Sequence, residues 1–120
     1  MSHIVTIQSK VRDPAAVAAA CRRMSLSAPA AGTAVLFGGE VSGLLVQLRG
    51  WTYPAVVDLG TGEVRFDNFA GHWGDRAHLD RFLQLYAVEK ARIEAKARGF
   101  PVTEQALEDG GIKLQIIEGS

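Results

Sequence analysis

The sequence predicts an α+β fold, in which a mainly antiparallel sheet of about six to seven strands carries two helices on one face. Two patterns predict this fold class. Several short segments alternate apolar and polar residues and are separated by glycine-containing turns. Two other segments repeat apolar residues at helical spacing. The 120 residues, 48% of them hydrophobic, are expected to form a single domain over residues 1–120 in the order βαββββαββ.

The first strand and the first helix are predicted within the first 24 residues. Residues 3–11 are expected to be a strand, because Val5 and Ile7 alternate with polar neighbours. Asp13 and Pro14 then begin a helix, since aspartate is a preferred N-cap residue and proline fits the first helical turn. The buried stripe of this helix is predicted to contain Val17, Cys21 and Met24.

The middle of the chain is predicted to be a series of hairpins. Gly38 and Gly39 are expected to form one turn, whereas Gly60 and Gly62 are both expected to supply positive φ angles in another. Pro54 indicates the start of a strand or an edge position, because proline cannot donate to a β-ladder. The strands between these turns are residues 33–38, 41–48 and 53–59, followed by a strand with Val64 and Phe66 on one face.

A long helix is predicted from Asp75 to Arg98, with Asp75 as its N-cap and Gly99 as its stop. Its C-terminal half, KARIEAKAR, is expected to extend beyond a small sheet and to project or meet a partner. A final hairpin is predicted from residues 102–107 and 112–117. The apolar stripe of the helix is predicted to be Leu79, Phe82, Leu83, Tyr86, Ile93 and Ala97.

Composition argues against several classes of function, although a local basic face for nucleic acid is still possible. Thirteen basic residues balance thirteen acidic ones, so the chain lacks the overall field that attracts nucleic acid or anionic lipid. The single cysteine, Cys21, cannot form an intramolecular disulfide and is interpreted as a small core residue, which fits a reducing, cytoplasmic compartment. We find no signal peptide and no apolar stretch long enough for a membrane span.

The segment DNFAGHWGDRAHLDRFLQLY, from Asp67 to Tyr86, lies where a strand gives way to the long helix. Polar and aromatic residues at such a junction indicate either demanding backbone geometry or a binding site. A metal site is not predicted, because zinc requires three or four ligands and only two histidines are present here. Acid–base chemistry could pair His72 with Asp67 or His78 with Asp75, although helix capping alone accounts for Asp75. The predicted ligand-binding residues are Asp67, Asn68, His72, Trp73, Asp75 and His78.

A partner surface is predicted elsewhere on the chain. Trp51, between Gly50 and Thr52 in a loop, is expected to make an exposed contact, while most other aromatic rings pack in the core. A stacking platform for nucleic acid would need more cations than Arg49 and Arg65 nearby. The predicted partner-surface residues are Trp51, Lys90, Arg92 and Lys96.

Three motifs carry a resemblance that extends over essentially the whole chain. They are SHIVTIQSKV at the start, the DNF and GHWGD junction, and LYAVEKA in the long helix. The chain resembles the family known from cyanobacteria and algal plastid genomes as hypothetical chloroplast frame thirty-five. That family has no established activity, so no catalytic residue is implied. The resemblance implies a stand-alone, single-domain protein, and relatives are encoded near an AAA-type ATPase and a very small companion protein.

The sequence therefore favours a non-enzymatic binding or adaptor module within a larger assembly, with a protein partner or a second copy of itself. No cofactor, metal or catalytic residue is predicted. The alternative is a small-molecule-binding protein or an enzyme, with its site at the junction from Asp67 to His78. This alternative requires a concave pocket that contains His72.

Overall fold

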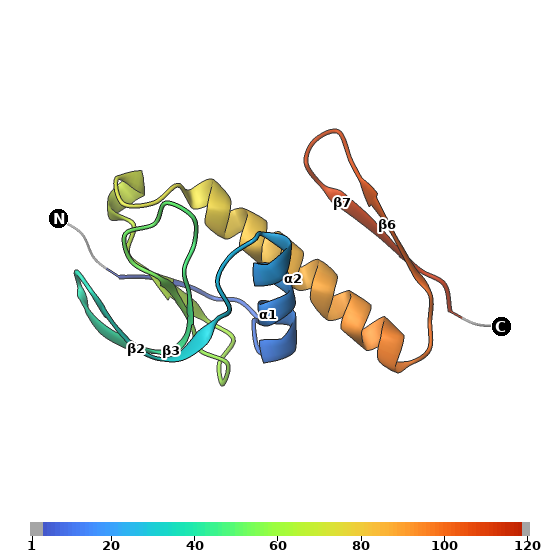
Figure 1. The fold of residues 1–120 in the computed structure, drawn as a ribbon, viewed down its shortest axis with the longest axis horizontal. Coiled ribbons are helices and arrows are strands. Elements are labelled where there is room, and N and C mark those ends of the chain that lie inside the picture. Colours follow the sequence, from blue (N-terminus) through green and yellow to red (C-terminus); the bar gives the residue numbers. More distant parts are fainter. Residues whose placement is uncertain (1–3, 119–120) are drawn as a thin grey trace.

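The computed structural model describes residues 4–118 as an α+β fold with a five-stranded antiparallel sheet, a two-stranded sheet and two α-helices (Figure 1). The predicted fold class is thereby confirmed, with seven strands in all. In chain order the elements are β1 (Val5–Ile7), α1 (Pro14–Arg23), β2 (Ala30–Leu36), β3 (Gly39–Val46), β4 (Ala55–Val57), β5 (Val64–Phe66), the short 3-10 helix η1 (Phe69–Gly71), α2 (Arg76–Ala97), β6 (Val102–Ala106) and β7 (Ile112–Ile116).

The larger sheet has the strand order β1-β5-β4-β3-β2, and every neighbouring pair is antiparallel. Leu36 pairs with Gly39, so the turn between β2 and β3 consists of Phe37 and Gly38 rather than the predicted Gly38 and Gly39. The first strand is also shorter than the predicted residues 3–11, and His3 lies outside the described residues.

Apolar side chains gather in two clusters, one on each face of the larger sheet. In β4, Ala55 and Val57 belong to the larger cluster and Val56 to the smaller one, because successive residues of a strand point to opposite faces. Both helices contribute to the larger cluster, for example through Val17 and Phe82. The smaller cluster consists of Ala34, Leu36, Val41 and Val56, with Ile4, Leu45 and Tyr53 packed against it.

The larger sheet is curled, so that its two edges approach each other. β1 and β2 are at opposite ends of the strand order, yet the residue before β1 lies close to the turn that follows β2. A Cβ added to Gly38 in this turn would lie 3.1 Å from Cγ1 of Ile4. The backbone N–H of Gly38 also donates to Oδ2 of Asp67, just beyond β5, at 3.1 Å. The turn between β2 and β3 is therefore brought beside the segment that leads into α2.

Local sequence signals specify both helices as predicted. Oδ1 of Asp13 accepts from Ala15 N, and Oδ1 of Asp75 accepts from Ala77 N, each at 2.9 Å. Gly99 ends α2 with a φ of +76°, a conformation that glycine adopts without steric cost.

Cys21 is fully buried, as predicted, and burial raises the pKa of its thiol. No helix within residues 4–118 combines the length and apolar character needed to cross a membrane.

The last hairpin forms a separate two-stranded sheet that returns beside α2 (Figure 1). Its Ile112 packs against the larger apolar cluster, and Gln84 Nε2 of α2 donates to the carbonyl of Gly110 at 3.0 Å. The hairpin also covers the C-terminal half of α2, where Arg92 lies 3.1 Å from Glu104 of β6. The predicted stripe of α2 is partly wrong, because Ile93 and Ala97 are exposed. Its buried residues are Leu79, Phe82, Leu85, Tyr86, Val88 and Ala95.

Candidate functional site

The junction between β5 and α2 contains unusual backbone geometry. Phe69 and Ala70 have φ angles of +47° and +51°, although neither is glycine, and Gly71 follows at +98°. Non-glycine residues in this region are strained by contacts between Cβ and the backbone. The carbonyl of Asn68 accepts from Gly71 N at 3.0 Å and from Trp73 N at 2.9 Å, which holds the turn closed. Such strain persists where the surroundings fix it, and it is often found at functional sites.

Two buried polar side chains fix this turn to the rest of the fold. Asp67 is 1% exposed, and its Oδ2 accepts from Gly38 N, whereas Oδ1 has no hydrogen-bond partner in the described part of the chain. Asn68 is also buried, and its Nδ2 donates to the carbonyl of Gly74 at 3.2 Å. The predicted residues Asp67 and Asn68 therefore shape the junction from within.

Trp51 is a correction to the predicted partner surface, because it is only 5% exposed. Its indole Nε1 donates to the carbonyl of Asp75 at 3.0 Å, and its ring meets Phe66 edge-on with 5.6 Å between centroids. A Cβ added to Gly74 would lie 2.6 Å from Cε2 of Trp51. Trp51 is buried because Gly74 leaves room for the indole against the start of α2.

Two exposed rings and three half-buried ones at the junction form what we call the aromatic patch. The exposed rings are Phe37 and His72, and the half-buried rings are Tyr53, Phe69 and Trp73. Trp73 lies at its centre, with ring centroids 4.7 Å from Phe69, 5.3 Å from Phe37 and 5.5 Å from Tyr53. Phe37 is 64% exposed, and the Trp73 ring is half-buried. His72 is exposed, and its ring lies tilted against Phe69 with 4.9 Å between centroids. The sequence predicted His72 and Trp73 as site residues but missed Phe37. Phe37 could have been predicted only if the turn between β2 and β3 had been placed at Phe37 and Gly38.

A hollow of about 570 Å³ opens beside the aromatic patch. Neither His72 nor His78 lines it, so the concave site with His72 that acid–base chemistry requires is not formed here. Asp75 caps α2, and no group of three His, Cys, Asp or Glu residues within residues 4–118 could hold a metal ion. The residues that line the hollow are Val5, Phe66, Asn68, Ala70, Gly71, Asp75 and Arg76.

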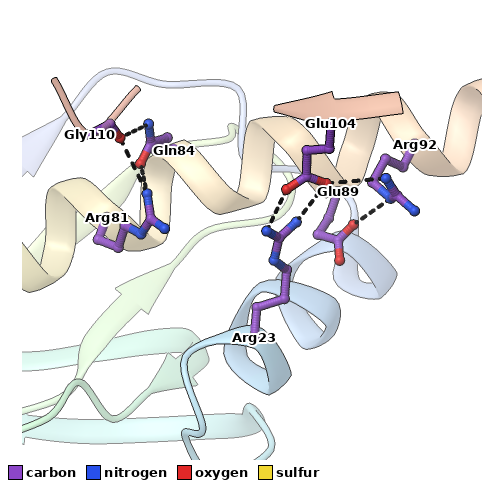
Figure 2. A network of polar contacts seen from close by, with 7 residues as sticks. All are labelled: Arg23, Arg81, Gln84, Glu89, Arg92, Glu104 and Gly110. Carbon is purple, nitrogen blue, oxygen red and sulfur yellow. Dashed lines mark hydrogen bonds and ion pairs between the residues drawn. The ribbon is translucent and has the colours of Figure 1, made fainter. Parts of the chain in front are cut away.

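The other predicted surface residues lie on the C-terminal half of α2. Lys90 Nζ lies 3.2 Å from Oδ2 of Asp13, which ties α2 to the start of α1. Arg92 belongs to a polar network in which Glu104 of β6 lies between it and Arg23 of α1 (Figure 2). The Glu104 carboxylate is 2.6 Å from Arg23 and 3.1 Å from Arg92. This network joins α1, α2 and the last hairpin.

A groove of about 670 Å³ lies beside this network, and we call it the α1–α2 groove. The predicted Arg92 and Lys96 line it, whereas Lys90 does not. The groove is formed by residues of α1, α2 and the segment that follows Gly99. The sequence pattern of any one of these elements could therefore not predict it. Its lining residues are Ala15, Ala19, Arg22, Glu89, Arg92, Ile93, Lys96, Gly99, Phe100, Pro101 and Val102.

We expect Glu104 to make the attachment of the last hairpin dependent on pH. Hydrogen bonds from the Arg23 guanidinium hold the pKa of Glu104 below its ordinary value, with further attraction from Arg92. We expect Glu104→Gln to lower the free energy of unfolding by about 1 to 2 kcal/mol at neutral pH. Because the folded-state pKa is the lower one, this contribution is fully present above the ordinary glutamate pKa of about 4.3 and is lost as the pH falls through the folded-state pKa.

Urea unfolding of the wild type and Glu104→Gln at neutral and acidic pH measures this effect. The difference between the two proteins should shrink in acid. Glu108→Gln is the matched control, since Glu108 is exposed at the tip of the same hairpin and should change stability little at either pH. An equal loss at both pH values for Glu104→Gln would show that charge plays no part.

Comparisons of the chain with protein-family models, with curated proteins and with solved structures find no match. Two surface features described above therefore carry the structural information about function. They are the aromatic patch at the start of α2 and the α1–α2 groove near its end.

Proposed function

We propose that this chain is a non-enzymatic binding module that works as a component of a larger assembly. The observation that supports it is the aromatic patch, in which Phe37 is 64% exposed against a half-buried Trp73. A contiguous apolar surface in which an exposed ring packs on half-buried rings is typical of interaction sites. Tyrosine, tryptophan and phenylalanine are also enriched at protein–protein interfaces, where they contribute much of the binding energy.

The aromatic patch is built on rigid supports, which favours a permanent binding surface. Phe37 belongs to a two-residue turn that Asp67 holds through Gly38 N, and Tyr53 packs against the smaller apolar cluster. Thr52 N donates to the carbonyl of Trp73 at 2.8 Å, which fixes the central residue of the patch. A preordered surface loses little conformational entropy when a partner binds.

The family resemblance supports the assembly part of the proposal. Relatives of the hypothetical chloroplast frame thirty-five family are encoded near an AAA-type ATPase and a very small companion protein. We propose these two as the first partners to test. The enzymatic alternative has less support, because neither histidine of the junction lines the hollow there.

Phe37→Asp is expected to abolish partner binding while the fold remains intact. It places a charge at a ring of the aromatic patch that is 64% exposed, where a partner would have to desolvate it. Affinity-tagged wild type and variant would be expressed in the host, and retained proteins would be quantified by mass spectrometry. A specific partner should be retained by the wild type and fall at least about tenfold with the variant, which corresponds to about 1.4 kcal/mol.

Val35→Asp is the matched control for this experiment. Val35 is 70% exposed on β2, two residues from Phe37, but it takes no part in the aromatic patch. It should retain the partner, and both variants should unfold within about 0.5 kcal/mol of the wild type. Equal retention by Phe37→Asp and Val35→Asp, or no specific partner of the wild type, would refute the proposal.

A further inference from the structure

We infer that the α1–α2 groove is a second docking site, and that its occupant is a segment of a partner protein in which carboxylates flank apolar side chains. This inference goes beyond the proposed function, which concerns the aromatic patch. It is carried by the composition of the groove floor, by the charges at its walls and by the position of the groove in the fold.

The floor of the groove is apolar and open. Ala15 and Ala19 lie one helical turn apart on α1, and their small side chains leave the space that the groove occupies. Opposite them, Ile93 of α2 is 36% exposed, and Phe100 and Val102 are half-buried. A partner that inserts apolar side chains here would bury surface that is now in water, which favours binding.

The walls of the groove are positively charged on both sides. Arg22 comes from α1, Arg92 and Lys96 come from α2, and Glu89 is the only carboxylate among the lining residues. Arg92 is held by Glu89 and Glu104, but no ion pair forms with Arg22 or Lys96 within residues 4–118. These two side chains can therefore pair with new carboxylates without breaking an existing ion pair.

This combination selects the chemistry of the occupant. An apolar floor between cations matches an amphipathic segment whose apolar side chains enter the groove and whose acidic residues meet the walls. Nucleic acid fits poorly, because its backbone would place phosphates over an apolar floor and only a few cations would meet it. The acidic residues of the partner segment are the source of specificity and of fast association.

The groove is independent of the aromatic patch. The patch lies before the N-terminus of α2, whereas Arg92 and Lys96 are in its last two turns. Arg92 lies sixteen positions after Arg76, which corresponds to about 24 Å of helix at 1.5 Å per residue. The two surfaces can therefore be occupied at the same time.

A photo-crosslinking amino acid placed at Ile93 tests this inference in the full chain. In the host, the crosslinked peptide should come from another protein and should carry Asp or Glu beside apolar residues. The double variant Arg22→Glu with Lys96→Glu should lower the crosslink yield at least about tenfold. The matched control is Arg49→Glu with Lys113→Glu, which makes the same change of net charge at exposed residues outside the groove and should leave the yield unchanged.

Each remaining outcome overturns the inference. The first is the absence of any crosslink from Ile93, and the second is a crosslink to a second copy of this chain or to lipid. The third is a partner segment without carboxylates, and the fourth is an equal crosslink yield from the two double variants. Failure here is distinguishable from failure of the proposed function. If partner binding still depends on Phe37 while Ile93 gives no crosslink, the groove is ruled out as a docking site and the aromatic patch is left as the binding surface.

Discussion

Replacing Trp51 by alanine is expected to lower the free energy of unfolding by about 3 to 5 kcal/mol, as is typical of large aromatic residues removed from a core. The change removes a ring that is 5% exposed and leaves a cavity beside Phe66 and Gly74. It also removes one of the two donors to the carbonyl of Asp75 at the first turn of α2, and leaves His78 N, at 3.1 Å, as the other. We therefore expect the junction to loosen together with the loss of global stability.

Trp73→Ala is the matched control, because it removes the same side chain from the surface. The half-buried Trp73 packs mainly within the aromatic patch, so we expect a loss of about 1 to 2 kcal/mol. Urea unfolding followed by far-ultraviolet circular dichroism measures both variants without depending on tryptophan fluorescence. Equal losses for the two variants would contradict the burial of Trp51.

Gly62→Ala is expected to destabilise the fold by about 2 to 4 kcal/mol, through strain and overpacking together. Gly62 has a φ of +82°, and an added Cβ would lie 2.7 Å from the carbonyl oxygen of Ser9 and 2.8 Å from Cα of Lys10. Those atoms are backbone and cannot rotate away. The carbonyl of Gly62 also accepts from Val11 N at 3.1 Å, so the same change disturbs the segment that leads into α1.

Gly60 in the same turn is the matched control. The prediction that both glycines need a positive φ angle is wrong, because the positive φ angles in this turn are limited to Gly62. An added Cβ at Gly60 would lie 3.3 Å from Oδ1 of Asp58, which is the end of a side chain. Gly60→Ala should therefore cost less than about 1 kcal/mol. Thermal unfolding of the two variants measures the cost of a side chain at each position. Similar unfolding midpoints would contradict the positive φ angle and the close backbone contacts assigned to Gly62.

Features that depend on neighbours in sequence were predictable. Asp13 with Pro14, Asp75 and Gly99 each specify a helix end through a local hydrogen bond or a local backbone angle, and all are found where expected. Less predictable was the buried stripe of α2. Ala95 is buried where Phe100 and Ile116 come close, because the chain returns beside the helix after Gly99. Helical periodicity within α2 does not indicate that the chain after Gly99 returns beside the helix.

The candidate sites depended on contacts between distant residues. Trp51 has a flexible loop sequence around it, and only the absence of a side chain at Gly74 explains why its ring is buried. The positive φ angles of Phe69 and Ala70 have no signal in residue type, because such angles usually indicate glycine. Phe37 reaches the aromatic patch through the curl of the sheet, which brings Gly38 beside Asp67. These long-range effects were outside the sequence prediction.

The continuous α2 also sets the geometry of anything attached at its two ends. A helix keeps both the axial distance and the rotational phase between distant points on its surface. Inserting one residue in its middle would turn everything beyond it by about 100° and shift it by about 1.5 Å, without altering either end chemically. The orientation of two simultaneous binding partners would thus be encoded in the number of residues between them.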